Sequence, residues 1–148
     1  SLPSRGLGDV YKRQIDAVTA DKISNKADTK ESDIDNIEEQ NMILDIGKNT
    51  VKLIKNEISK SKTVFWNGPL GVFETSPFDR GTVEIAKFIS NLTANNKIRS
   101  FAGGGDTISA LDLAGVKDNF SYVSTGGGAL LELIEGKKLP GLVALGIL

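Results

Sequence analysis

Short apolar runs alternate along the chain with longer segments in which apolar residues recur every three or four positions. The short runs predict strands at residues 17–20, 42–46, 63–67, 98–102, 120–123 and 142–145. The segments of helical spacing predict helices at residues 48–60, 79–95, 107–114 and 129–135. Residues 21–40 are polar and acidic, and we interpret them as a surface loop. This alternation favours an α/β fold, a three-layer αβα arrangement whose Rossmann-like sheet is mainly parallel and covered on both faces.

Three segments of unusual composition follow predicted strands of this sheet. They are Asn67-Gly68-Pro69, the run at residues 103–107 and the run at residues 124–128. In open α/β sheets, ligands bind outside the carboxyl ends of the strands. We therefore expect these segments, although distant in sequence, to converge on one edge of the sheet and to form a binding site there.

The first glycine run comprises Gly103, Gly104, Gly105, Asp106 and Thr107, between a predicted strand and a predicted helix. Glycine lets the backbone approach a ligand closely, and the first N–H groups of a helix attract anions. In one interpretation the glycine amides contact a phosphate or a nucleoside, Asp106 binds Mg²⁺, and Thr107 contacts phosphate oxygens. In the other, Asp106 is the N-cap of the helix and the glycines form a tight turn. The motif by itself favours neither interpretation.

The second run, at residues 124–128, contains no charged side chain that would compete with a bound anion. It predicts an anion-binding helix N-terminus, or else a turn capped by Ser124 or Thr125. Adjacent glycines lose much backbone entropy on folding, and a plain turn needs only one of them. The presence of Gly126, Gly127 and Gly128 together therefore favours the binding interpretation.

Composition excludes several function classes. The chain of 148 residues has no cysteine and no histidine, which excludes thiol chemistry, imidazole acid–base chemistry and the usual zinc sites within it. A net charge of -1 does not favour nucleic acid or anionic membranes as partners. No apolar run approaches the roughly 20 residues that span a bilayer, so we expect a cytoplasmic protein. Neither the P-loop nor the G-x-G-x-x-G fingerprint is present, so a nucleotide site would have to be built differently.

Residues 1–14 differ from the rest of the chain. They are rich in turn formers, more basic than the remainder and without periodicity. They resemble a translated adapter sequence, and a natural disordered arm is the alternative. We therefore expect the folded unit to begin at Ile15.

Taken together, the motifs resemble those of phosphoglycerate kinase, in the same order and with plausible spacing. The matching segments are residues 66–69, 71–74, 77–82, 103–107 and 124–129, and residues 131–141 continue the similarity. The resemblance runs from about Ile15 to the end of the chain and covers roughly the last third of that family's length. It implies that residues 15–148 form part of the nucleotide-binding domain of a two-domain kinase.

The resemblance also implies a reaction and a role for each motif residue. The reaction is phosphoryl transfer between 1,3-bisphosphoglycerate and ADP, which gives 3-phosphoglycerate and ATP. Asp106 would organise Mg²⁺, Asn67 and Thr107 would contact nucleotide phosphates, Glu74 would bind the ribose, and Pro69 would line the pocket. The glycines of the first run would contact the nucleotide, and those of the second, Gly126, Gly127 and Gly128, would stabilise the phosphoryl group in transit.

Partners follow from the same resemblance. We expect ADP or ATP with Mg²⁺, no nucleic acid or membrane partner, and a monomer for the full-length enzyme. The family's basic phosphoglycerate-binding domain has no counterpart in this chain, so we expect the chain by itself to be inactive. A stand-alone, non-catalytic module that binds nucleotide or phosphate is the alternative.

Overall fold

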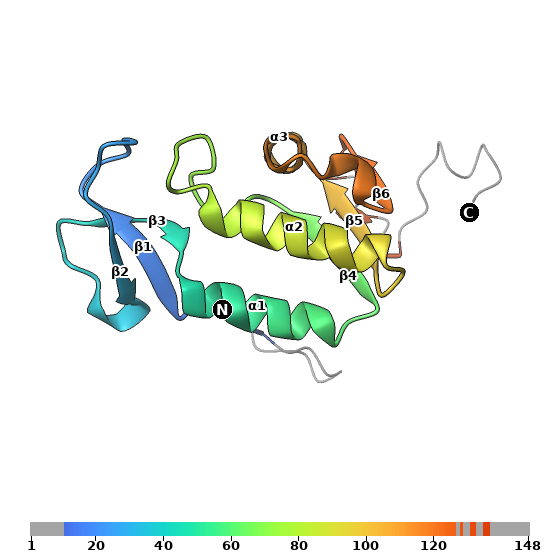
Figure 1. Ribbon diagram of the computed structural model, residues 1–148, viewed down its shortest axis with the longest axis horizontal. Coiled ribbons are helices and arrows are strands. Elements are labelled where there is room, and N and C mark those ends of the chain that lie inside the picture. Colours follow the sequence, from blue (N-terminus) through green and yellow to red (C-terminus); the bar gives the residue numbers. More distant parts are fainter. Residues whose placement is uncertain (1–10, 127, 129–130, 133–134, 137–148) are drawn as a thin grey trace.

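The computed structural model describes residues 11–126, 128, 131, 132, 135 and 136, and it is a mixed α/β structure (Figure 1). The α/β class is therefore confirmed. In chain order the elements are β1 (Asp16–Ala20), β2 (Lys30–Asp33), the 3₁₀-helix η1 (Ile34–Asn36), β3 (Met42–Ile46), α1 (Lys48–Ser59), β4 (Thr63–Asn67), α2 (Arg80–Ala94), β5 (Arg99–Gly103), α3 (Gly105–Ala114), the 3₁₀-helix η2 (Lys117–Asn119) and β6 (Tyr122–Ser124). The strand expected at residues 142–145 lies outside the described residues.

The second half of the chain forms a parallel three-stranded sheet in the order β4-β5-β6. Helices α2 and α3 connect its strands, as parallel neighbours require. The register places Asn67 opposite Gly103 and Gly103 opposite Ser124. The three strands therefore end level with one another, which confirms that the segments after them converge on one edge.

The first three strands form a separate antiparallel sheet in the order β2-β1-β3. It occupies the left end of the molecule in Figure 1. The strands predicted at residues 17–20 and 42–46 form, but they lie outside the parallel sheet. The interpretation of residues 21–40 as a surface loop is wrong for residues 30–36, where β2 and η1 lie. Strand β2 has the polar sequence KESD and lies at the sheet edge. It therefore lacks the alternating apolar pattern that predicts a strand.

The main core lies between the three helices and one face of the parallel sheet. Trp66 and Ala102 point into this core and are buried. The other face carries a row of aromatic rings, in which Phe65 stacks on Phe101 at 4.9 Å and Tyr122 follows at 6.4 Å. Phe65 is 48% exposed and Tyr122 is 54% exposed, so the described residues leave much of this row open to solvent.

Two buried aspartates join the antiparallel sheet to the helices. Asp16 of β1 accepts hydrogen bonds from the backbone N–H groups of Asn49 and Thr50, both at 2.8 Å, in the first turn of α1. Burial by itself raises the pKa of Asp16, but the hydrogen bonds from Thr50 and Asn49 outweigh it and hold that pKa below its ordinary value. Gly47 leaves the necessary space, since a Cβ there would lie 2.3 Å from the Asp16 carboxyl carbon.

Asp45 of β3 makes the corresponding contact with α2. Its carboxylate accepts the N–H groups of Gly81 and Ile46, both at 2.8 Å, and its side chain is almost completely buried. Burial raises the pKa of Asp45 to about 6, the neighbouring Asp79 carboxylate adds to the rise, and the two hydrogen bonds oppose it. Glycine is needed beside it, because a Cβ on Gly71 would lie 2.5 Å from an Asp45 oxygen.

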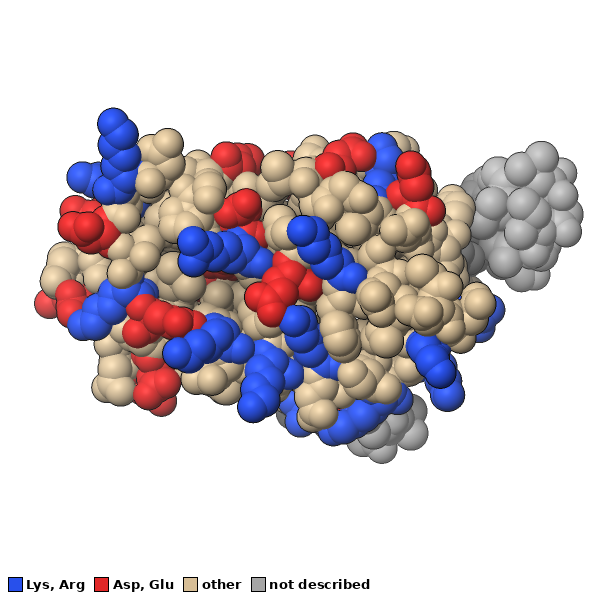
Figure 2. Space-filling view, viewed as in Figure 1, with Lys and Arg blue, Asp and Glu red and all other residues tan. Residues whose placement is uncertain are grey.

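The surface over α1 and α2 has mixed charge. Figure 2 shows lysine and arginine side chains lying among acidic ones on this face. Ion pairs join some of them, including Lys55 with Glu84 at 2.5 Å and Lys48 with Glu31 at 3.9 Å. Among the residues that the structure describes, no helix is long and apolar enough to cross a membrane.

Candidate functional site

The carboxyl edge of the parallel sheet brings three loops into contact. The N–H of Gly104, just after β5, donates to the carbonyl of Ser124 at 3.1 Å. The N–H of Gly68, just after β4, donates to the hydroxyl of Thr107 at 2.6 Å. These bonds tie the loop after β4 to the first turn of α3, and the turn between β5 and α3 to the end of β6. The candidate site is therefore one connected surface, as the positions of the motifs predict.

The loop between β5 and α3 turns sharply at Gly104. Its φ of +97° is unfavourable for a residue with a side chain. A Cβ at this position would also lie 3.2 Å from the Asn67 side-chain oxygen. The N–H of Gly104 is already bonded to Ser124, so Gly104 offers a ligand no free donor. Its lack of a side chain instead lets a ligand come close to the backbone.

Helix α3 begins directly after this turn. Its N-cap is Gly104, which provides no side-chain hydrogen bond, and Asp106 lies in the first turn. The interpretation of Asp106 as the N-cap is therefore wrong. Gly105 and Asp106 are exposed, and a Cβ on Gly105 would have no neighbour within 4 Å. The first N–H groups of a helix have no acceptor within it, so this open end can bind an anion.

The second glycine run is only partly described. The N–H of Gly126 donates to the hydroxyl of Ser124 at 3.2 Å, which folds the loop back on the end of β6. Gly126 and Gly128 are exposed, and Gly128 has helical conformation. Gly127 lies outside the described residues. The roles of the three glycines stay predictions.

Pro69 and Glu74 belong to the long loop between β4 and α2. Pro69 is half-buried and directly follows Gly68 at the edge. The loop then runs toward the antiparallel sheet, where the N–H of Val72 donates to the carbonyl of Leu44 at 2.8 Å. Glu74 is exposed, and within the described part of the chain its side chain makes no hydrogen bond or ion pair. The structure thus connects Asn67 and Pro69 to the glycine runs but does not join Glu74 to them.

Asp106 carries an exposed carboxylate in the first turn of α3. No group of three or more carboxylate, histidine or cysteine side chains that could hold a metal ion occurs among the described residues. Mg²⁺ commonly takes one or two protein carboxylates and completes its shell with phosphate oxygens and water. An exposed carboxylate in the first turn of α3 fits an ion that arrives together with a phosphate ligand, and it does not fit a resident all-protein site.

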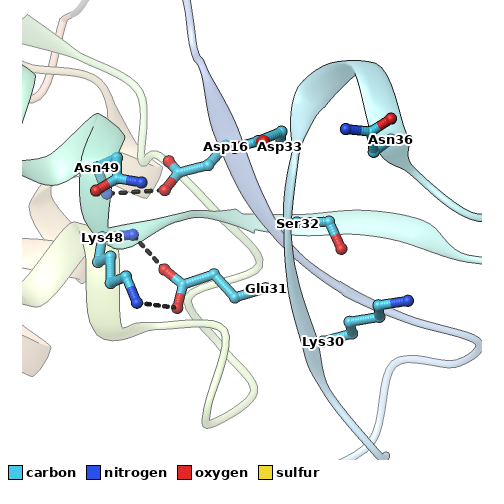
Figure 3. A pocket seen from close by; sticks show the side chains of 8 residues that line it. All are labelled: Asp16, Lys30, Glu31, Ser32, Asp33, Asn36, Lys48 and Asn49. Carbon is cyan, nitrogen blue, oxygen red and sulfur yellow. Dashed lines mark hydrogen bonds and ion pairs between the residues drawn. The ribbon is translucent and has the colours of Figure 1, made fainter.

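One surface hollow lies beside this edge, and another lies away from it. The first, of about 450 Å³, lies between α3 and β6 and is lined by Ile108, Lys117, Asp118, Phe120, Ser121, Tyr122, Val123 and Thr125. It touches the second glycine run through Thr125. The other, of about 390 Å³, lies at the start of α1 and contains none of the expected site residues (Figure 3). There Asp16 and Glu31 already accept the N–H groups of Asn49 and Lys48, so that helix end offers no free anion site.

Comparison with known proteins gives a consistent result. The family model described as phosphoglycerate kinase matches residues 8–137. The chain is 51% identical over 131 residues to a phosphoglycerate kinase of Chelativorans sp. (strain BNC1) and 47% identical over 131 residues to that of Xanthobacter flavus. Each alignment covers 88% of this chain and 33% of the relative. The chain therefore spans about a third of the length of these curated relatives.

Solved structures agree with the sequence matches. The structure of phosphoglycerate kinase from Coxiella burnetii superposes with a TM-score of 0.78 at 39% identity, over 89% of this chain and 33% of that one. The enzyme from Pyrococcus horikoshii OT3 gives a TM-score of 0.69 at 34% identity, over 90% of this chain and 32% of that one. The family match begins at residue 8, inside the segment that composition sets apart. The boundary at Ile15 stays a prediction.

Proposed function

Because the chain belongs to the phosphoglycerate kinase family, we propose that it supplies part of the Mg-nucleotide half-site of a glycolytic kinase. The reaction is phosphoryl transfer between 1,3-bisphosphoglycerate and ADP, with 3-phosphoglycerate and ATP as products. The observation that carries this proposal is the junction of three loops at the carboxyl edge of the parallel sheet, beside the open first turn of α3. Phosphoryl transfer depends mainly on positioning and charge stabilisation, and these are what such an edge can supply.

The proposed roles are those that the resemblance implies, and for all but Glu74 the position of the residue at the edge supports the role. Exposed Asn67, half-buried Pro69 and the glycines around Gly104 would receive the nucleotide. Asp106 would hold Mg²⁺ through its exposed carboxylate, and the bound ion would neutralise phosphate charge. Glu74 would reach the ribose from its exposed position in the loop between β4 and α2.

The second glycine run would act on the phosphoryl group itself. Gly126, Gly127 and Gly128 would present backbone N–H groups to the group in transit, without a side chain to block its approach. We further propose a cytoplasmic enzyme that is monomeric at full length and does not bind nucleic acid or membranes. Light scattering on the full-length protein checks the monomer.

The first test is direct binding. The purified chain is titrated with Mg-ADP by calorimetry, together with Asp106→Asn and, as a matched control, Asp28→Asn at an exposed position far along the chain from the edge. We expect saturable binding that Asp106→Asn weakens and Asp28→Asn leaves unchanged. Equal affinity of wild type and Asp106→Asn, with equal Mg²⁺ dependence, would reject Asp106 as the metal residue.

The second test concerns activity. A chimera in which this chain replaces the matching third of the Chelativorans relative tests catalysis in a full-length setting. We expect ATP formation by the chimera, a loss of at least about tenfold in its Asp106→Asn variant, and no turnover by the isolated chain. A folded but inactive chimera that binds Mg-ADP would instead support a nucleotide-binding module.

A further inference from the structure

Side chains hold three backbone polar groups at the start of the loop between β4 and α2. The N–H of Gly68 donates to the Thr107 hydroxyl at 2.6 Å, and the carbonyl of Gly68 accepts the indole N–H of Trp66. The N–H of Leu70 donates to the Thr82 hydroxyl at 3.0 Å. Pro69, between them, has no N–H to satisfy. The loop is thus fixed from α3 through Thr107 and from α2 through Thr82.

Both threonine acceptors are buried, which makes these bonds costly to lose. Thr107 is 1% exposed and Thr82 is 0% exposed. A buried backbone N–H that has lost its acceptor destabilises the fold by the full free energy of its desolvation. Gly68 also has a φ of +99°, a conformation that surrounding contacts must hold in place. The hydroxyl oxygens of the two threonines are the acceptors in both restraints.

We infer that Thr82 and Thr107 are positioning residues that hold residues 67–70 in one conformation before any ligand arrives. What they position, namely Asn67 and Pro69 for a nucleotide, rests on the proposed function. An ordered loop binds more tightly because less conformational freedom is lost on binding.

The test separates the hydroxyl from the side-chain volume. Thr107→Val and Thr82→Val keep the volume and lose the acceptor, whereas Thr107→Ser and Thr82→Ser keep the acceptor. Thr93→Val is the matched control, because Thr93 bonds the Ile89 carbonyl and the Ser100 hydroxyl, away from the loop. Amide hydrogen exchange of the full chain is measured residue by residue by NMR, and Mg-ADP affinity is measured by titration.

We expect exchange at Gly68 to rise about tenfold or more in Thr107→Val, and exchange at Leu70 to rise similarly in Thr82→Val, as loss of one hydrogen bond implies. The two serine variants and Thr93→Val should stay near wild type at these amides. The Val83 amide, in the first turn of α2 and bonded to the carbonyl of the N-cap residue Asp79, reports loosening of that helix end and should not change. Mg-ADP affinity should fall about tenfold in Thr107→Val and recover in Thr107→Ser.

Unchanged exchange at Gly68 and Leu70 in folded valine variants would overturn the inference. So would serine variants as impaired as the valine variants, since only packing would then matter. If Thr107→Val does not fold, the comparison of Thr107→Ser with Thr107→Ala decides in the same way. If the wild-type chain does not bind Mg-ADP, the proposed function fails for this chain, while the exchange data still support or refute the positioning role.

Discussion

The buried carboxyl of Asp45 makes the stability of this chain depend on pH in an unusual direction. Its pKa is raised from 3.8 to about 6 in the folded protein, mainly because burial disfavours the charged form. Between these two pH values the folded state binds more protons at this site than the unfolded state. Stability from this group is therefore full below pH 3.8 and falls as pH rises to about 6.

The size of the effect on the free energy of unfolding follows from the rise in the pKa of Asp45. At about 1.4 kcal/mol for each tenfold change in proton affinity, the rise amounts to about 3 kcal/mol. The nearby carboxylate of Asp79 adds to the rise in the pKa of Asp45, and within the described part of the chain its Oδ1 atom is buried without a hydrogen-bond partner. Asp45→Asn removes the titration and keeps the shape of the side chain. It also replaces one of the two acceptor oxygens with an NH₂ group, which adds a cost that does not depend on pH.

The assay is urea unfolding followed by the fluorescence of Trp66, the single tryptophan, for wild type and Asp45→Asn from pH 4 to pH 7. The stability of the variant relative to wild type should rise with pH, and most of the ~3 kcal/mol should appear in this interval. Groups common to both proteins, such as Asp16, cancel in the difference. Asp28→Asn, at an exposed position, should follow the wild-type curve. A flat difference curve for Asp45→Asn would refute the argument.

Three further predictions concern backbone geometry and capping. Asp16→Ala leaves the N–H groups of Asn49 and Thr50 without their acceptor and should lower the free energy of unfolding by about 2 kcal/mol, measured by urea unfolding at pH 7. At that pH wild-type Asp16 is charged, and its contribution is lost only as pH falls through its lowered pKa, so the cost of the substitution should shrink in acid. Gly104→Ala should lower the free energy of unfolding by about 1 kcal/mol or more, because φ is +97° and the Asn67 side chain is close. Gly105→Ala, at a position with open space and no positive φ, should leave the free energy of unfolding unchanged or raise it. Equal effects of the two substitutions in thermal unfolding would contradict this reasoning. Gly47→Ala should be more disruptive than Gly104→Ala, because its Cβ would collide with the buried Asp16 carboxyl group, and circular dichroism would show whether α1 is lost.

The position of the motif segments at one edge of the sheet was predictable because the signals for it are local. A strand followed by glycines and then by a helical pattern places residues 103–107 at a strand end whatever surrounds them. The same holds for Asn67 and for Ser124, and the register confirms that they are neighbours. The contacts of Thr82 and Trp66 with the loop gave no sequence signal, since a buried threonine or tryptophan next to a motif is compatible with simple packing.

Local patterns in the sequence were enough to predict which segments between residues 63 and 124 become strands and helices, and where the motif residues lie along them. These properties depend on hydrophobic periodicity and on the backbone freedom of glycine, both of which act over a few residues. The tertiary structure, and no local pattern, set the pairing of β1, β2 and β3 as a separate antiparallel sheet. It also decided that Asp16 and Asp45 reach the first turns of α1 and α2 from 33 to 36 residues away. Strand pairing and capping across such distances depend on which groups the whole fold brings together and removes from water, and no local pattern encodes that.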